Sequence, residues 1–308
     1  MSFETTLADL ADPAKRPTSQ QLVDFSNLDA AEVAALEEVW GEIEPLRRYR
    51  LVHDLADMTQ DNVELNFDAV HKLALRDEVP EVRRAALAGL YEYEGRDLIN
   101  PLATALREDP DVDVRREAAI GLGRYALAGE LGYLREGDIS TVREALIEST
   151  EDLEEDERVR ARAIEALGAL SGDETDNLIE SIYHEDSLWL KVGAVDSMGR
   201  SANEIWLPLV LRELQNPAPE MRHAAAFAAG EIGEEEAVPA LRHMARSDPD
   251  HEVQTVAVRA IGAIGGVQAR VALKSLLYEG DDDLRETIQE TMTEMLEEED
   301  PLSPPGLR

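Results

Sequence analysis

The side chains that could perform catalysis or bind a metal are few in this chain. It has six histidines and no cysteine, which excludes disulfides, thiolate nucleophiles and cysteine-ligated metals. Metal and acid–base sites need histidines and carboxylates that converge, whereas the pair His184–Glu185 falls in an expected turn. No glycine-rich phosphate loop, Ser–His–Asp arrangement or set of paired metal ligands emerges. We therefore predict no catalytic residue, no metal site and no cofactor, and a protein that is not an enzyme.

Negative charge dominates the chain, with 66 Asp and Glu against 30 Lys and Arg and a formal net charge of −36. Such a field repels phosphate backbones and anionic membranes, so we expect no nucleic acid and no membrane partner, and a basic protein partner is favoured. The start "MSFETTLADL" lacks a signal-peptide pattern, and we expect a cytoplasmic protein. The basic cluster "RRYR" at Arg47, Arg48 and Arg50 could contact an acidic partner or an anion, or balance neighbouring carboxylates.

An internal repeat organises the sequence. A short segment that often begins with Pro, a polar turn and a longer segment with apolar residues at helical spacing follow one another. A helix pair this small cannot bury its apolar face alone, so neighbouring pairs must stack. A Val–Arg-like dipeptide marks each copy at intervals of 31 or 32 residues, with one interval of 45. The copies are Val82–Arg83, Val114–Arg115, Val159–Arg160, Leu190–Lys191, Met221–Arg222, Val253–Gln254 and Leu284–Arg285.

Small side chains dominate the second helix of each repeat. Alanine stands four residues after the Val-like position in six of the seven copies, on the same helical face as an apolar residue eight positions after it. Alanine at that point lets neighbouring helices approach closely. Glycine follows at the ninth position in five copies, where we expect it to end the helix. These glycines are Gly123, Gly168, Gly199, Gly230 and Gly262.

The unit "D-x-x-x-x-V-R-x-x-A-x-x-A-L-G" resembles HEAT repeats of the short, phycobilisome-lyase type over about residues 63–296. The resemblance implies an all-α fold, a right-handed α–α superhelix of about eight stacked helix pairs. It also implies a ladder along the turns between repeats, in which an acid or amide lies six positions before each basic residue. The planar fork of arginine can bind carboxylates and helix-end carbonyls together. The ladder residues are Asp77, Arg83, Asp109, Arg115, Glu154, Arg160, Glu185, Lys191, Asn216 and Arg222.

The repeat register also predicts the domain organisation. We expect residues 1–20 to be a mobile tail and residues 21–62 to be a degenerate capping helix pair. A second mobile tail is expected at residues 297–308. The long interval places an insertion near residues 126–138, as a loop or extra helical turn that projects from the stack.

Two enzyme families offer an alternative through resemblance. The segment "RHAAAF" at His223 is similar to the Arg-His-Glu segments of deoxyhypusine hydroxylase, a HEAT-repeat di-iron enzyme, but Ala224 stands where that pattern has glutamate. Phycobilin lyases share the repeat type, and nothing in the sequence marks a pigment site. These resemblances leave open an accessory protein or enzyme that modifies a partner protein, either bilin-lyase-like or di-iron hydroxylase-like.

A candidate binding surface comes from the second helices, which line the concave side in HEAT-like solenoids. Positions one before, two after and six after the Val-like residue lie within about 60° of one another, away from the apolar stripe. They are mostly polar, except in the fourth and fifth repeats. We predict a partner-binding patch there, formed by Trp189, Val192, Asp196, His223 and Phe227, with Ile120 nearby in the second repeat.

Trp189 has two possible positions in this prediction. It either stands exposed as an anchor for a partner's apolar side chains or folds back over the adjoining turn as additional core. The predicted function is a non-enzymatic protein–protein interaction scaffold that binds a partner on its concave face.

Overall fold

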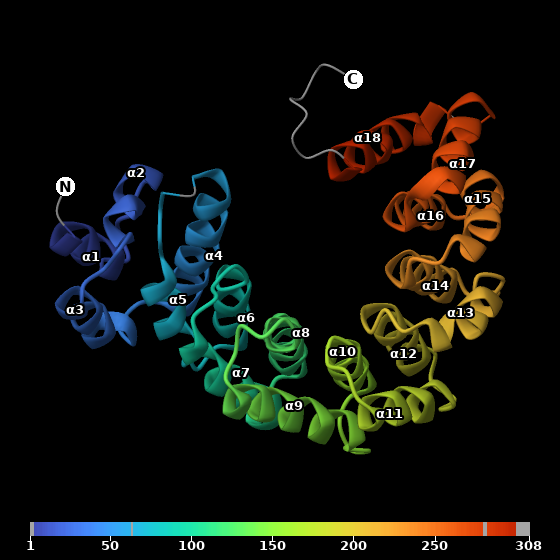
Figure 1. Cartoon of the computed structure of the whole chain (residues 1–308). Coiled ribbons are helices and arrows are strands. Elements are labelled where there is room, and N and C mark those ends of the chain that lie inside the picture. The colour runs from blue at the N-terminus through green and yellow to red at the C-terminus, as the bar shows by residue number, and fades with distance from the viewer. Residues whose placement is uncertain (1–2, 63, 280–281, 300–308) are drawn as a thin grey trace. The chain divides into compact units, whose positions relative to one another are not determined.

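The computed structural model describes residues 3–62, 64–279 and 282–299, and every regular element in these ranges is a helix. The chain forms two compact units, Met1–Leu122 (unit 1) and Gly123–Arg308 (unit 2). The division falls inside helix α8 (Val112–Glu130). Figure 1 shows the helices in chain order. The predicted all-α fold of stacked helix pairs is confirmed.

Unit 1 holds a core beneath its longest complete helix. Helix α4 packs on α6, and the core contains the fully buried side chains of Phe25, Leu36 and Leu55. Two 3₁₀ turns lie at Val23–Phe25 and Arg96–Leu98. The complete helices are α1 (Phe3–Ala11), α2 (Ser19–Leu22), α3 (Ala30–Trp40), α4 (Pro45–Asp61), α5 (Asp68–Ala74), α6 (Pro80–Gly89) and α7 (Ile99–Glu108).

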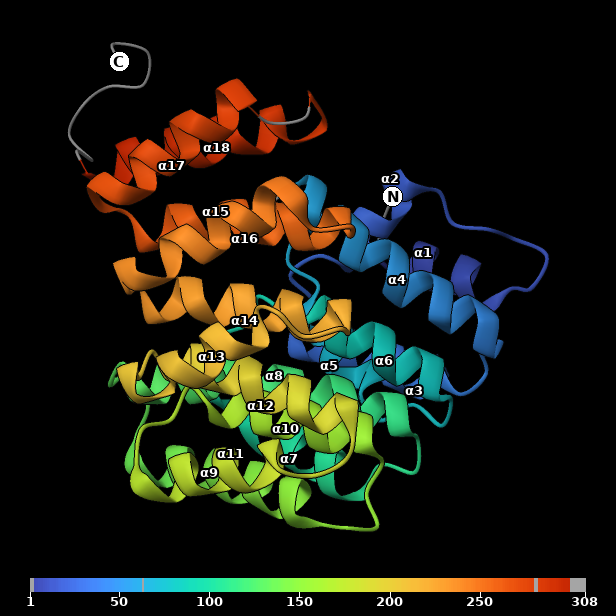
Figure 2. The same ribbon diagram turned by 90° about the vertical axis from the view of Figure 1, so that its right-hand side faces the viewer.

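Unit 2 repeats one helix pair in two layers. The second helix of each pair packs on the second helix of the next pair, so α10, α12, α14, α16 and α18 form one layer (Figures 1 and 2). The first helices of the pairs form the other layer. Two 3₁₀ turns lie at Glu204–Trp206 and Glu235–Ala237. The helices are α9 (Glu136–Glu151), α10 (Glu157–Leu167), α11 (Asp173–Tyr183), α12 (Leu188–Arg200), α13 (Leu207–Glu213), α14 (Pro219–Ile232), α15 (Val238–Ser247), α16 (His251–Ile264), α17 (Gly266–Glu279) and α18 (Asp282–Glu299).

Local sequence signals start these second helices. Ser187 caps α12 by accepting a hydrogen bond from the backbone N–H of Leu190, and Asp250 caps α16 in the same way. Pro219 stands in the first turn of α14, where its missing N–H has no helical partner to lose. Alanines at the repeat centre, such as Ala194 and Ala225, are fully buried against the neighbouring helix. Composition and capping therefore agree with the stacked arrangement.

The ninth-position glycines do not end their helices, apart from Gly168, which caps α10. A Cβ atom at Gly199 would lie 2.6 Å from the Cα of Ala228, and one at Gly230 would lie 2.8 Å from the Cα of Ala260. Neighbouring second helices thus approach within a distance that no side chain permits at these positions. We expected glycine to act as a terminator, but here it allows close packing between helices.

The N-terminal prediction is wrong for the described part of residues 1–20. Helix α1 packs against the rest of unit 1 through Phe3, Leu7 and Leu10, which are all buried. The rings of Phe3 and Phe25 meet edge to face with centroids 5.7 Å apart. Apolar residues at these spacings form one helical face, so the segment joins the core instead of forming a tail.

The insertion consists of an extension of α8 and a short loop, whereas the C-terminus differs from expectation. Residues 126–130 continue α8, and the side chains of Tyr125 and Ala126 are buried. The segment without a helix is confined to residues 131–135, where Tyr133 is exposed. Residues 297–299 of the expected C-terminal tail belong to α18, and residues 300–308 lie outside the described residues.

Candidate functional site

The turns of unit 1 are joined by the side chain of Arg83. Its Nε and Nη2 atoms each donate a hydrogen bond of 2.7 Å to the carboxylate of Asp109, and its Nη1 donates to the backbone carbonyl of Asp77 at 2.8 Å. The acid six positions earlier therefore supplies only its carbonyl oxygen, and the carboxylate comes from the next repeat. Arg115 likewise donates to the carbonyl of Asp109 at 2.7 Å.

Unit 2 contains the same arrangement at Arg222. Its Nε and Nη2 bind the carboxylate of Asp248 at 2.7 Å each, and its Nη1 binds the carbonyl of Asn216 at 3.0 Å. Burial acts to raise the pKa of Asp248, but the hydrogen bonds from Arg222 outweigh it and hold the pKa below its usual value. The same arginine contacts therefore occur in one turn of each unit, at Arg83 and at Arg222.

At two predicted ladder positions, the side chains do not make the contacts that the ladder pattern predicts. Arg160 binds the carboxylate of Glu185 at 2.8 Å and the carbonyl of Thr150 at 2.9 Å, while the Glu154 side chain is exposed in the turn. The Lys191 side chain makes no hydrogen bond or ion pair with the residues that the structure describes, and its ammonium group lacks the planar fork with which arginine binds two acceptors.

The basic cluster "RRYR" binds protein groups within unit 1. Arg48 is buried and donates to the carboxylate of Asp77 at 3.2 Å and to the carbonyl of Ile43 at 2.9 Å. Arg47 donates to the carbonyls of Leu10 and Lys15. Arg47 and Arg48 thus extend the polar network of the turns towards the N-terminus.

A groove of about 520 Å³ lies on the second-helix layer of unit 2. Three successive helices line it, α10, α12 and α14, with the start of α16 at one edge. Five of the six residues predicted for partner binding line this groove: Trp189, Val192, Asp196, His223 and Phe227. Ile120 belongs to α8 of unit 1 and is not among the lining residues.

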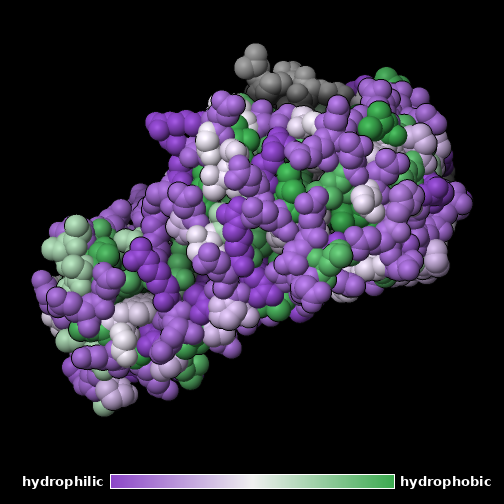
Figure 3. Space-filling model, turned by 90° about the horizontal axis from the view of Figure 1, so that it is seen from below, coloured by the Kyte–Doolittle hydropathy of each residue, from purple (hydrophilic) through white to green (hydrophobic). Residues whose placement is uncertain are grey.

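Trp189 is 56% exposed, which decides between the two positions that the sequence left open. The other two tryptophans, Trp40 and Trp206, are 8% and 7% exposed. The surface seen in Figure 3 is mainly hydrophilic, with apolar residues in small separate patches. Trp189 thus lies exposed at a groove that the half-buried ring of Phe227 also lines.

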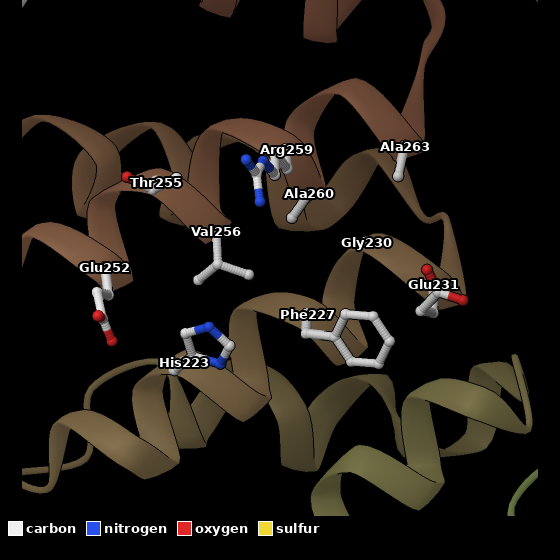
Figure 4. Close-up of a pocket in the computed structure, with 10 residues that line it drawn as sticks. All are labelled: His223, Phe227, Gly230, Glu231, Glu252, Thr255, Val256, Arg259, Ala260 and Ala263. Atoms are coloured by element: carbon white, nitrogen blue, oxygen red, sulfur yellow. The ribbon is translucent and has the colours of Figure 1, made fainter. Parts of the chain in front are cut away.

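Phe227 and His223 also line a second hollow of about 520 Å³ between α14 and α16. In Figure 4 both side chains project from α14 towards Val256 on the facing helix, with Glu252 and Arg259 at the margins. The two hollows share these residues, so together they form a continuous hollowed surface over three helices, from Trp189 on α12 to Val256 on α16.

Asp196 is the electrostatically unusual residue of the groove. Burial, together with the negative charge of Glu165, raises the pKa of Asp196 to about 7 against the opposing effect of Arg162 and Arg200. Both arginines bind Glu165, with Arg200 at 2.6 Å. The carboxylate of Asp196 has no hydrogen bond or ion pair with any described residue. A partly buried carboxylate without a partner is a common property of functional sites.

Arg162, Glu165 and Arg200 belong to the groove but were missed in the sequence. Glu165 stands 31 residues before Asp196 at the same repeat position, so the repeat register already placed the two acids side by side. The competition between them for the same arginines follows only from the side-chain geometry.

Metal binding has no support in the side-chain arrangement. The chain contains two His-Glu dipeptides, His184–Glu185 and His251–Glu252. Within the described ranges, no three His, Asp or Glu side chains are grouped so that they could hold a metal ion. The di-iron site that the resemblance would imply therefore does not fit these residues. In the same ranges, no helix is long and apolar enough to cross a membrane.

A curated relative changes the interpretation of activity. The chain is 34% identical over 109 residues to deoxyhypusine hydroxylase of Cryptococcus neoformans var. neoformans serotype D, an alignment that covers 34% of this chain and 30% of the relative. The chain thus matches less than a third of the relative's length. Our prediction that the protein is not an enzyme is contradicted by this similarity to part of an enzyme, and we do not retain it.

Solved structures show a similar fold at low identity. The CpcE–CpcF complex of phycocyanin lyase from Nostoc sp. PCC7120 is 16% identical with a TM-score of 0.55, over 92% of this chain and 97% of that chain. Yeast importin-beta (Kap95p) is 15% identical with a TM-score of 0.52, over 96% of this chain and 46% of that chain. These likenesses concern the fold alone.

The repeat itself is recognised in two parts of the chain. The family model of HEAT repeats matches residues 67–149 and 206–293, which together make up more than half of the sequence. This match agrees with the stacked helix pairs and with the arginines in the turns. The chain therefore belongs to the HEAT-repeat family.

Proposed function

We propose that the protein binds a partner protein in the groove of unit 2, on the layer formed by the second helices. The exposure of Trp189 carries this proposal, because large aromatic side chains are seldom left in water without a partner. Trp189 and Phe227 come from neighbouring helices and line the same groove. Together they offer two apolar anchors within a surface of charged residues, which is the composition of a binding hot spot.

The packing beneath the groove supports a rigid binding surface. Gly193 and Gly199 hold α12 close to its two neighbours, since a Cβ atom at Gly193 would lie 2.5 Å from the carbonyl oxygen of Ala161. Aromatic anchors fixed on closely packed helices lose little conformational entropy when a partner binds.

The test replaces both anchors with alanine and measures capture of a partner. Wild-type protein and the Trp189→Ala/Phe227→Ala variant are used to isolate binding proteins from a native lysate, and the recovered partner is then titrated in purified form. We expect at least a tenfold loss of affinity, equivalent to about 1.4 kcal/mol, with unchanged helicity by circular dichroism.

Tyr91→Ala is the matched control, because Tyr91 is a similarly exposed aromatic residue of unit 1 at 51% exposure. It should leave the affinity unchanged. Unaltered binding by the double variant, or its unfolding, would show that Trp189 and Phe227 are not anchors for a partner.

A second candidate is an enzyme that acts on a partner protein, which the 34% identity with deoxyhypusine hydroxylase favours. Metal analysis and the absorption spectrum of the purified protein test it directly. Stoichiometric iron or a bound chromophore would support this candidate, and we derive no catalytic step because the described residues provide no matching ligand set.

A further inference from the structure

The chemistry of the occupant can be inferred from the charges that line the groove, an inference that rests on the proposed function. Asp196 lines the groove together with the aromatic anchors of α12 and α14, and none of the described residues forms a hydrogen bond or ion pair with its carboxylate. A carboxylate in this position loses water on folding without gaining a protein partner. A cation from outside would supply what the fold does not.

The rest of the lining has the same sign. Besides Asp196, four carboxylates line the groove, whereas its two arginines are both bound to one of these acids, Glu165. The groove thus has an excess of negative charge and no free cation among its described residues. The four further carboxylates are Glu165, Glu220, Asp250 and Glu252.

We propose that the groove accepts an arginine or lysine side chain of the partner protein, with its cation paired to Asp196 and its methylene stem between Trp189 and Phe227. The aromatic rings suit this occupant, because a cation is attracted to an aromatic face and the aliphatic stem packs on apolar surface. An acidic or phosphorylated segment is the less suitable occupant, since it would have to displace Glu165 from its two arginines.

Trp189 provides a reporter within the site. It is the exposed tryptophan of the three, so its indole N–H signal in two-dimensional NMR, assigned with Trp189→Phe, reports on the groove. The probes are acetylated and amidated heptapeptides of sequence Gly-Ser-Gly-X-Gly-Ser-Gly, in which X is arginine, citrulline or glutamate. Citrulline keeps the shape of arginine and removes its charge.

At pH 8 we expect the arginine peptide to bind at least fivefold more tightly than the citrulline peptide. Asp196→Asn should reduce that preference to less than twofold. Glu136→Gln is the matched control. It removes one exposed negative charge from α9, outside the groove, and so changes the net charge of the protein by the same amount as Asp196→Asn. The preference should persist in this control.

The pH dependence separates Asp196 from its neighbours. Arginine preference should increase between pH 6 and pH 8 in the wild type and stay constant in Asp196→Asn, because the neutral acid cannot pair with a cation. His223→Gln should keep the increase, which excludes the histidine of the groove as its cause. The charged groups that face Asp196 are Arg162 and Glu165 on α10, Arg200 on α12, Glu220 and His223 on α14, and Asp250 and Glu252 at the start of α16.

Several results would overturn this inference while leaving the proposed function intact. Equal binding of the arginine and citrulline peptides, tighter binding of the glutamate peptide, or no shift of the Trp189 signal with any peptide would each reject a cationic occupant. If the double alanine variant still lost the captured partner in those cases, the groove would remain the binding site for a partner of different chemistry.

Discussion

Units 1 and 2 are built from the same repeat and differ in how the charged side chains on their second helices are paired. In unit 1, the face of α6 and α8 carries Arg84, Asp113 and Arg116, and these residues pair with one another at distances of 3.0 and 3.7 Å. In unit 2, the equivalent face carries Trp189, Phe227 and an unpaired Asp196. The turns at Arg83 and Arg222 make matching contacts in the two units, so the comparison assigns stability to these turns and specialisation to the exposed second-helix positions.

Each unit also contains an ionisable group whose neutral form is favoured by burial, His71 in unit 1 and Asp196 in unit 2. His71 is buried in unit 1, where burial lowers its pKa. Asp196 lines the groove of unit 2, where burial raises its pKa to about 7. Both shifts favour the neutral form of the side chain, but they make the two units respond to pH in opposite directions.

The largest expected effect tests the shared part of the comparison. Arg83→Ala in unit 1 and Arg222→Ala in unit 2 should each lower the free energy of unfolding by about 3 kcal/mol, because each leaves a largely buried carboxylate without its cation and a turn carbonyl without its arginine donor. Urea unfolding followed by circular dichroism measures the loss. Arg116→Ala, on the exposed face, should cost less than about 1 kcal/mol.

A markedly smaller loss in one unit would contradict the equivalence of the turns. Such a result would mean that the ladder stabilises the repeats unequally despite its matching distances.

The second prediction tests the close helix packing beneath the groove. Gly199→Ala should lower the free energy of unfolding by about 2 kcal/mol, since the new Cβ atom would collide with the backbone of Ala228 at 2.6 Å. Gly137→Ala is the control, because nothing lies within 4 Å of a Cβ atom at that helical position. It should be neutral or stabilising by up to about 1 kcal/mol, and a similar loss in both variants would contradict close packing as the cause.

The sequence predicted the features that recur and missed those that depend on two repeats at once. Helix pairs, buried alanines and the basic positions of the turns follow from the interval of 31 or 32 residues. The partner of each arginine could not be read in the same way, because Arg83 binds Asp109 in the next repeat and leaves the Asp77 carboxylate to Arg48. The role of glycine was likewise misread, since contact between helices leaves no trace in local spacing.

The sequence also predicted only part of the candidate site. Five of its residues were found because an aromatic side chain interrupted columns that are otherwise polar. The missing partner of Asp196 was not found, because it results from competition with Glu165 for Arg162 and Arg200, which a single sequence does not reveal.

The third prediction concerns the pH response of unit 2. Because the folded-state pKa of Asp196 lies above its unfolded value, its contribution to stability is complete below about pH 4 and is lost as the pH rises to about 7. Asp196→Asn removes this loss and should raise the free energy of unfolding by about 1–2 kcal/mol at pH 8, a figure that allows for the partial exposure of the carboxylate.

That gain should shrink as the pH falls from 8 towards 5, which urea titrations at several pH values would detect. A gain that is independent of pH would indicate that the introduced amide changes the packing of the groove, and the raised pKa would then not describe Asp196.

The smallest expected effect concerns the pH response of unit 1. The imidazole of His71 packs on Gly89, and its Nε2 lies 3.2 Å from the carbonyl oxygen of Val52. Its Nδ1 has no hydrogen-bond partner among the described residues, so a charged ring would be poorly satisfied there. The unfolded chain therefore takes up the proton first as the pH falls, and stability is lost below about pH 6.5.

Lowering the pH from 7.5 to 5.5 should cost unit 1 about 1 kcal/mol through this histidine. Hydrogen exchange measured by mass spectrometry can follow α5 and α6 in unit 1 and, in the same sample, α12 and α14 in unit 2. Protection of α5 and α6 should fall with pH in the wild type and much less in His71→Gln, which cannot titrate but can still donate to Val52.

Because protonation of Asp196 stabilises unit 2 over the same range, protection of α12 and α14 should move in the opposite direction. A parallel loss of protection in both units, unchanged by His71→Gln, would mean that acid acts on the general charge of the chain, and the contrast between the two enclosed groups would fail.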